Sequence, residues 1–294
     1  MTVSIRQIHP VFVGEVSGLD ITRPISPAEV AAVEAGMDRY AVLVFHDQRL
    51  SDEQQMVFSR NFGVLEDARG GNITKPEDRR LQVGMNDVSN LGRDGAPMAR
   101  DSRQRLFNLG NMLWHSDSSY RAIPAKYSIL SARVVNPVGG NTEFADMRAA
   151  YDALDADTKK LVEDLVCEHS LMYSRGSLGM VEYSDEERAM FRPVRQSLVR
   201  THPVSGRRSL YLSAHAGAII GMPIAEARIL LKDLPEHATQ PAFVNAHTWR
   251  TWDVVMWDNR QMMHRARRYD EAQPRDMRRT TIAGDTPTTA QVAA

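Results

Sequence analysis

The sequence predicts a mainly β fold of the α+β class, an antiparallel sandwich or jelly roll with flanking and inserted helices. From residue 113 onward, short apolar runs are separated by Gly and Pro, as in all-β domains. A few segments with helical spacing lie among these runs, without the strict alternation of strand and helix that a Rossmann fold requires. The chain contains neither G-x-G-x-x-G nor G-x-x-x-x-G-K-[ST], which further weakens a nucleotide-binding fold.

Local signals near the N-terminal end predict two helices with a strand between them. Ser26, followed by a proline and an early glutamate, is typical of a helix start, and apolar residues then recur at helical spacing up to Tyr40. The run 41–45 is short, apolar and largely β-branched, which indicates a buried strand. Residues 51–54 form a capping-box pattern that opens a second helix, expected to continue through Phe62 and end at Gly63.

The segment 67–110 differs in composition from its surroundings and is predicted to be a long, mobile loop. Gly, Pro, Asp and Arg dominate it, and 81–88 is its one strand-like piece. Loops of this length in compact domains are usually lids or linkers. Because periodic apolar segments resume on both sides, we expect an active-site lid within a single catalytic domain that spans 1–294.

Beyond this loop, short strands and three helices are expected. Alternating or continuous apolar runs predict strands at 127–135, 142–145, 197–201, 209–213, 242–249, 254–257 and 278–283. Apolar residues at 3.6-residue spacing predict helices at 146–154, 157–167 and 223–237.

Composition and charge exclude several classes of protein. The 36 Lys and Arg residues nearly balance the 37 Asp and Glu residues, so the net charge of −1 gives poor support for binding nucleic acid or an anionic membrane surface. A single cysteine, Cys167, cannot form an intramolecular disulfide and fits a reducing compartment. The N-terminal residues lack an apolar signal core, and no apolar stretch is long enough for a membrane span. We expect a cytoplasmic location and a small-molecule partner.

The sharpest chemical feature is His115-Ser116-Asp117. On a strand, residues two apart point to the same face, so the imidazole of His115 and the carboxylate of Asp117 would converge. His264, just past the apolar strand 254–257, is the natural third ligand. Two imidazoles and one carboxylate with open positions are typical of non-haem Fe(II) oxygenases. Taken alone, a His-x-Asp pair is more often a hydrogen-bonded surface pair.

A basic segment follows His264 and contains a second candidate site. Arg275 and Arg279 are four residues apart with Met277 between them, so a strand would place all three on one face. The two Arg residues would lie about 13–14 Å apart on a fully extended strand of ~3.3 Å rise, and a bulge would bring them nearer. An ordinary solvated basic run is the alternative. Close to a metal ligand, however, a guanidinium can bind a dicarboxylate held by that metal.

Together these residues resemble the Fe(II)/2-oxoglutarate-dependent dioxygenases of the taurine dioxygenase family, from about His9 to Asp285. Within that family, three segments are most similar to the 2,4-dichlorophenoxyacetate dioxygenases. The residues that carry the family resemblance are His115-Ser116-Asp117, 139–142, 257–260, His264, Arg275 and Arg279, and the three segments are 113–119, 144–154 and 265–270.

The resemblance implies a double-stranded β-helix fold and a role for each candidate residue. It makes His115, Asp117 and His264 the Fe(II) ligands. It makes Arg275 the residue that binds the distal carboxylate of 2-oxoglutarate, helped by the hydroxyl of Thr142.

The resemblance also suggests how the substrate is bound. Arg279 falls at the position of an Arg that reaches the substrate anion, and Asn111 falls on a substrate-contacting Asn. O2 is the second cosubstrate, and ascorbate serves as the reductant in vitro. We further expect a homo-oligomer.

The implied reaction is hydroxylation of an aryloxyalkanoate, such as 2,4-dichlorophenoxyacetate, at the carbon next to the ether oxygen. The products would be a phenol, glyoxylate, succinate and CO2. The nearest alternatives keep this chemistry but act on a sulfonate such as taurine, an alkyl sulfate ester or a natural aromatic acid. A non-catalytic β-helix protein that binds a metal and a dicarboxylate is an alternative of another class.

Other residues with reactive side chains are expected to have structural roles. Cys167 falls on the predicted helix 157–167 and should be inert. The remaining buried-type His and Trp residues have no partner visible in the sequence and fit a core or a satisfied hydrogen bond better than a ligand. These residues are His169, His202, His215, His237, His247, Trp249, Trp252 and Trp257.

Overall fold

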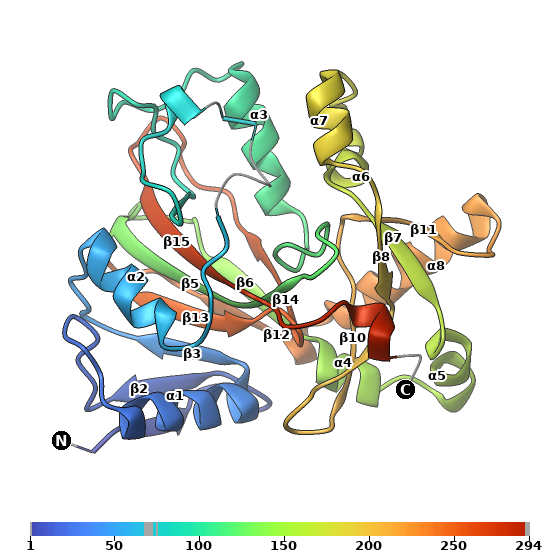
Figure 1. Ribbon diagram of the computed structural model, residues 1–294, viewed down its shortest axis with the longest axis horizontal. Coiled ribbons are helices and arrows are strands. Elements are labelled where there is room, and N and C mark those ends of the chain that lie inside the picture. Colours follow the sequence, from blue (N-terminus) through green and yellow to red (C-terminus); the bar gives the residue numbers. More distant parts are fainter. Residues whose placement is uncertain (1, 68–72, 75, 292–294) are drawn as a thin grey trace.

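A computed structural model describes residues 2–67, 73–74 and 76–291 of the protein (Figure 1). Its centre is a seven-stranded sheet in the order β1-β2-β3-β13-β5-β15-β4. Neighbouring strands are antiparallel except for the parallel pair β2–β3. The strands are β1 (Ser4–Gln7), β2 (Gly14–Ser17), β3 (Val42–Phe45), β4 (Asn86–Asp87), β5 (Ala125–Val134), β13 (Val254–Asp258) and β15 (Asp276–Ala283).

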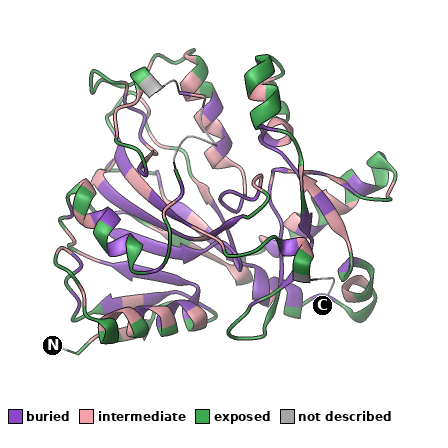
Figure 2. Ribbon diagram, viewed as in Figure 1, coloured by how far each residue is buried: buried purple, intermediate pink, exposed green. Residues whose placement is uncertain are grey.

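Alternation along the central strands gives this sheet two apolar faces. On β3, Leu43 and Phe45 pack on one face against helices α1 (Pro27–Tyr40) and α2 (Asp52–Arg60). Val42 and Val44 point to the opposite face. The central strands are therefore buried on both sides, and Figure 2 shows them mostly in the colour of buried residues.

The second apolar face is covered by a three-stranded sheet in the order β12-β6-β14. Phe144 and Met262 of this sheet pack in one core cluster with Leu130, Val255 and Trp257 of the large sheet. The fold is thus a mixed α and β fold in which two sheets pack face to face. The three strands are β6 (Thr142–Asp146), β12 (Val244–His247) and β14 (Met262–Ala266).

A second core lies to the right in Figure 1, where two small sheets, β11-β7-β8 and β10-β9, pack with several helices. The strands are β7 (Val166–His169), β8 (Val194–Ser197), β9 (Val199–Thr201), β10 (Arg208–Leu210) and β11 (Ala216–Ile219). The helices of this half are α4 (Met147–Asp152), α5 (Ala156–Val162), α6 (Leu171–Gly176), α7 (Asp185–Met190) and α8 (Ile224–Ala238), with 3-10 turns η3 (Pro241–Phe243) and η4 (Thr288–Gln291).

The expected N-terminal elements are confirmed, whereas the predicted helix 157–167 is wrong in its second half. α5 ends at Val162, and Cys167 lies on strand β7, where it pairs with β8 and β11. Long-range pairing overrides the local helical spacing there. Cys167 is fully buried, and burial raises the pKa of its thiol to about 12, so it is a poor nucleophile as expected.

The predicted loop 67–110 is only partly irregular, and its residues 68–72 and 75 lie outside the described residues. It contains a 3-10 turn η1 (Pro76–Asp78), the two-residue strand β4 in place of the expected strand 81–88, and helix α3 (Arg103–Asn108), which runs into the 3-10 turn η2 (Leu109–Met112). Ser102 caps α3 by accepting a hydrogen bond from the backbone of Arg105. Within the described part of the chain, no helix has the length and apolar character of a membrane span.

Candidate metal centre and ligand pocket

His115 and His264 are joined through their backbones. The His115 amide donates to the His264 carbonyl at 3.0 Å, and the His264 amide donates to the His115 carbonyl at 2.8 Å. This isolated antiparallel bridge brings the segment before Asp117 against strand β14. The expected strand at 115–117 is therefore a single bridge, and a turn with Ser118 at a φ of 55° follows it.

The side chains of His115, Asp117 and His264 converge. One ligand atom from each lies within 4.8 Å of the other two, and no other group of three His, Cys, Asp or Glu residues in the described part of the chain does so. Each imidazole Nε2 lies 3.7 Å from a carboxylate oxygen of Asp117. His115 Nδ1 donates to the carbonyl of Leu113 at 2.7 Å, which leaves the Nε2 lone pair free for a metal.

Burial and charge give these three groups the protonation states of metal ligands. Burial lowers the pKa of His115 and lowers that of His264 well below the usual value, so both imidazoles are neutral at pH 7. Burial alone would raise the pKa of Asp117, but the charge of Arg279 and a hydrogen bond from Ser128 outweigh it and hold the pKa at about 2. Two neutral nitrogens and a carboxylate form the donor set of non-haem Fe(II) sites.

The orientation of Asp117 is fixed by several hydrogen bonds. Ser128 Oγ donates to its Oδ2 at 2.7 Å, and Arg279 Nη1 donates to its Oδ1 at 2.6 Å. The Asp117 amide donates to Asn259 Oδ1, which also accepts a hydrogen bond from Trp257 Nε1. These hydrogen bonds hold the carboxylate in one orientation, as a preorganised ligand requires.

A pocket opens beside the three side chains, between the two sheets and helix α3. Six of the seven site residues expected from the sequence line it, namely Asn111, His115, Thr142, His264, Arg275 and Arg279. The remaining lining residues are Val88, Ser89, Asn108, Met112, Leu130, Trp257, Ala266, Tyr269 and Met277.

Arg275 is a buried cation on the pocket wall, and its guanidinium could bind an anion. Its Nη2 donates to the carbonyl of Gly140 at 2.7 Å, but none of the described carboxylates forms a salt bridge with it. Burial lowers its pKa, in the direction expected for a guanidinium without an anion. Gly140 makes room for this arrangement, because a Cβ there would lie 2.5 Å from Arg275 Nη1. The pocket therefore offers a guanidinium to an anionic ligand.

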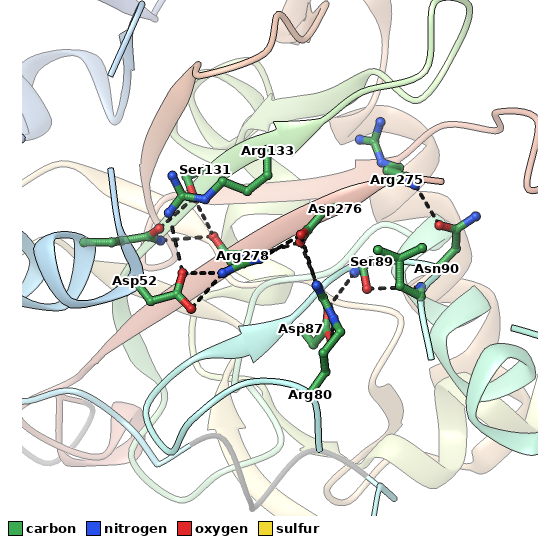
Figure 3. A network of polar contacts seen from close by, with 12 residues as sticks. Asp52, Arg80, Asp87, Ser89, Asn90, Ser131, Arg133, Arg275, Asp276 and Arg278 are labelled. Atoms are coloured by element: carbon green, nitrogen blue, oxygen red, sulfur yellow. Dashed lines mark hydrogen bonds and ion pairs between the residues drawn. The ribbon is translucent and has the colours of Figure 1, made fainter. Parts of the chain in front are cut away.

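Arg275, directly before strand β15, and Met277 and Arg279 on β15 lie on the pocket wall. The pairing of β15 with β5 shifts register between Asp276 and Met277, and the extra residue of this bulge is Arg133 on β5. Arg278 points away from the pocket and pairs with Asp52 and Asp276 (Figure 3).

Comparison with known proteins decides the family. Residues 4–281 match the family model described as taurine catabolism dioxygenase TauD, TfdA family. The chain belongs to the TauD/TfdA family. This confirms the expected family and the enzyme class, a 2-oxoglutarate-dependent dioxygenase.

Three relatives show which members of the TauD/TfdA family this protein is similar to. It is 48% identical over 286 residues to the alpha-ketoglutarate-dependent 2,4-dichlorophenoxyacetate dioxygenase of Burkholderia sp. (strain RASC), covering 97% of this chain and 95% of the relative. It is 39% identical to the (S)-phenoxypropionate/alpha-ketoglutarate-dioxygenase of Delftia acidovorans, covering 88% of each. It is 69% identical to AAD-2, solved in complex with Mn(II) and N-oxalylglycine, with a TM-score of 0.96 and coverage of 98% of this chain and 100% of the other.

Sequence reasoning missed several residues of the TauD/TfdA pocket. Val88 and Ser89 belong to the segment expected to be a lid, and Asn108 and Met112 flank the end of helix α3. Trp257, Ala266 and Tyr269 fell within segments that carried the resemblance. The Ser102 cap would have revealed α3 and, with it, the two Asn side chains at its C-terminal end.

The pocket wall at Val88 and Ser89 is fastened to strand β15. Val88 and Asn90 donate backbone hydrogen bonds to the carbonyls of Met277 and Arg275, and Asn90 Oδ1 accepts the Arg275 amide at 2.8 Å. Arg80 binds both Asp87 and Asp276 with pairs of hydrogen bonds of 2.8–3.0 Å (Figure 3). The segment 80–90 is thus clamped beside the Arg275 backbone.

Replacing Arg80 with Gln should destabilise the fold. The variant leaves Asp87 and Asp276 partly desolvated with fewer donors, so we expect the free energy of unfolding in urea to fall by about 1.5–3 kcal/mol at pH 7. Arg103→Gln is the matched control, because its pair with Glu187 has two hydrogen bonds as well but the Arg side chain is 47% exposed. The control should cost at most about 1 kcal/mol. Equal losses in the two variants would contradict the clamp.

The effect of Arg80→Gln should also depend on pH. Burial alone would raise the pKa of Asp276, but hydrogen bonds from Arg80 and Arg278 outweigh it and hold the pKa at about 2, below the usual 3.8. A lowered carboxyl pKa stabilises the fold fully above its unfolded value, and this contribution is lost as the pH falls through the folded value. The difference between wild type and variant should therefore shrink from about pH 4 to pH 2.

Proposed function

We propose that this protein hydroxylates aryloxyalkanoates, such as 2,4-dichlorophenoxyacetate, at the carbon next to the ether oxygen, with 2-oxoglutarate as cosubstrate. The observation that carries the proposal is the convergence of His115, Asp117 and His264 beside a pocket that contains the unpaired guanidinium of Arg275. The names of the 48% and 39% identical relatives support the substrate class.

His115, Asp117 and His264 would hold Fe(II). Their two free imidazole nitrogens and ionised carboxylate fit a divalent transition metal that leaves positions open for other ligands. When bound, the iron together with 2-oxoglutarate and O2 supplies the oxidant that hydroxylates the substrate carbon, and 2-oxoglutarate becomes succinate and CO2. The hydroxylated product is a hemiacetal, which collapses to a phenol and glyoxylate.

Arg275 and Thr142 would bind the cosubstrate. A guanidinium fork is suited to a carboxylate, and burial strengthens the attraction because little water screens it. Thr142 is buried on the same pocket wall and carries a hydroxyl that can donate to the same anion.

Arg279 and Asn111 would bind the carboxylate of the aryloxyalkanoate. Arg279 already lies next to the metal ligands, since its Nη1 contacts Asp117. An anion held there keeps its neighbouring carbon close to the metal, which selects the C–H bond that is attacked. Val88 and Met112 supply apolar surface for an aryl ring, whereas the amine of taurine would need acceptors.

Several finer expectations belong to the same proposal. The two facing sheets would be the halves of a double-stranded β-helix, or jelly roll, within one catalytic domain that spans 1–294. The segment 67–110 would act as the active-site lid that excludes water during oxidation. The homo-oligomeric state and the cytoplasmic location also stay predictions.

A substrate panel tests the proposed function. Purified protein is supplied with Fe(II), ascorbate, 2-oxoglutarate and air, and succinate is measured with phenoxyacetates, phenoxypropionates, taurine, an alkyl sulfate and natural aromatic acids. We expect succinate and phenol to form together from the phenoxyacetates. Succinate formation that depends only on a sulfonate or sulfate would reject the substrate class and keep the dioxygenase chemistry.

Replacing Arg275 with Lys should selectively weaken the binding of 2-oxoglutarate. Lys keeps the charge but loses the planar fork, so we expect the apparent affinity for 2-oxoglutarate to fall by about 1–3 kcal/mol. The KM of the aromatic acid should change less. Arg278→Lys is the control, because Arg278 faces Asp52 and Asp276 outside the pocket. If Arg278→Lys alone altered the 2-oxoglutarate dependence, the assignment of Arg275 would be wrong.

A further inference from the structure

The indole of Trp249 is hydrogen-bonded to a residue of the pocket wall. Trp249 lies two residues beyond strand β12, whose last residue, His247, is paired in register with Thr142 on β6. Trp249 Nε1 donates to Thr142 Oγ1 at 2.9 Å, and both side chains are buried. Trp249 itself does not line the pocket. Its hydrogen bond to the pocket wall is to Thr142, and it packs in one core cluster with the pocket residues Leu130, Trp257 and Met277.

This contact determines what the Thr142 hydroxyl can do. An indole N–H can only donate, so the Thr142 oxygen acts as the acceptor and keeps its own hydrogen. Among the hydrogen bonds of the described residues, the Thr142 hydroxyl donates none. Because Thr142 faces the pocket beside Arg275, this hydrogen is available to an acceptor inside the pocket.

We propose that Trp249 is a positioning residue for the cosubstrate. It fixes the Thr142 side chain so that the hydroxyl donates to the carboxylate that Arg275 binds. The inference rests on the proposed function, since it takes the ligand to be 2-oxoglutarate. Without the indole N–H, the hydroxyl oxygen has an unfilled lone pair, and the side chain loses the contact that selects its orientation.

The loop after β12 holds Trp249 in place before any ligand binds. The His247 ring packs edge-on against the indole, with ring centres 4.6 Å apart and an interplanar angle of 90°. His247 Nε2 lies 3.1 Å from the buried Asp253 carboxylate, which also accepts the Arg250 amide. Asn141, next to Thr142, donates to Thr248 Oγ1 at 3.1 Å. The loop therefore sets the indole rigidly against Thr142.

A double-mutant cycle tests the role of Trp249. We would measure the Kd of N-oxalylglycine for the Mn(II)-loaded protein by calorimetry, which does not depend on turnover. Trp249→Phe keeps most of the ring and removes the donor, and should weaken binding about 3–10-fold, as for one hydrogen bond. Thr142→Val should weaken binding at least as much. The double variant should bind no more weakly than Thr142→Val.

Trp252→Phe is the matched control, because it makes the same chemical change in the same loop, where Trp252 contacts Arg49 and Arg133 instead. It should leave the Kd unchanged. An unchanged Kd in Trp249→Phe, or an equal loss in the Thr142→Val background, would overturn the inference and leave the proposed function intact. Failure of the wild type to bind N-oxalylglycine would instead overturn the proposed function.

A spectroscopic measurement reports on the contact itself. The protein has 4 Trp residues, so 15N-tryptophan labelling gives that number of indole N–H signals. The signal lost in Trp249→Phe should shift in Thr142→Val, and should shift again when N-oxalylglycine and Zn(II) are added to the wild type. A signal that responds to neither change would contradict the hydrogen bond as a link to the ligand.

Discussion

His115→Ala and Asp117→Ala should each abolish turnover while the protein stays folded. Each variant removes one of the three proposed ligands, and a site with two remaining ligands would lose both affinity for Fe(II) and its geometry. Asp117→Glu should fail as well, because the added methylene moves a carboxylate that Ser128 and Arg279 hold in one position. The effect should be a loss of at least about 10³-fold in succinate formation, the scale of removing a group that acts only through the metal.

Fe(II) titration and circular dichroism separate loss of metal from loss of fold. His237→Ala is the control, since His237 binds the carbonyl of Ala150 in the second core, outside the pocket. It should keep Fe(II) affinity and turnover. Wild-type affinity and activity in His115→Ala would show that the three residues are not the metal centre.

Arg279→Ala should lower kcat/KM for a phenoxyacetate far more than for its uncharged methyl ester. A charge-assisted hydrogen bond to the substrate carboxylate contributes about 1.5–3 kcal/mol, so kcat/KM for the acid should fall about 10–150-fold. Arg279 also contacts Asp117, and loss of that contact would slow acid and ester alike. The ratio of the two substrates therefore isolates the anchoring role. Asn111→Ala should cost less, because a neutral contact contributes about 0.5–1.5 kcal/mol.

The assay for Arg279 also distinguishes the leading substrate classes. The wild type should cleave phenoxyacetate to phenol, with the methyl ester a much poorer substrate. Equal losses for acid and ester in Arg279→Ala would place the residue with the metal ligands only. Sulfite release from taurine, without phenol from phenoxyacetate, would reject the aryloxyalkanoate assignment.

Sequence signals correctly predicted the elements that depend only on residues close together in the chain. The capping box of Ser51 and Gln54 forms as expected, because both partners lie within one turn of α2. Cys167 was misplaced because the apolar spacing of 157–167 continues past Val162, while the pairing of β7 with β8 and β11 depends on residues far along the chain. Sequence spacing contains no record of such partners.

In the candidate site, too, local sequence predicted some features and not others. That His115 and Asp117 share a face followed from their separation, even though a bridge and a turn produce it in place of a strand. The approach of His264 was an expectation from chemistry and resemblance, with no local pattern behind it. Trp249 escaped notice because its role depends on the register of β12 against β6, which brings His247 beside Thr142. Its sequence neighbourhood indicates only a core aromatic.

The paired backbone hydrogen bonds between His115 and His264 have a consequence for how folding and metal binding are coupled. In small zinc-dependent domains the ion itself closes the chain, so the free energy of binding is also the free energy of folding. Here the polypeptide closes the long loop between the two imidazoles by itself, and the entropy of that closure is lost during folding. At the proposed metal centre an incoming ion would meet ligands that are already in place. We therefore expect the ion to bind and leave while the chain remains native, and its binding to add to the stability of a fold that forms without it.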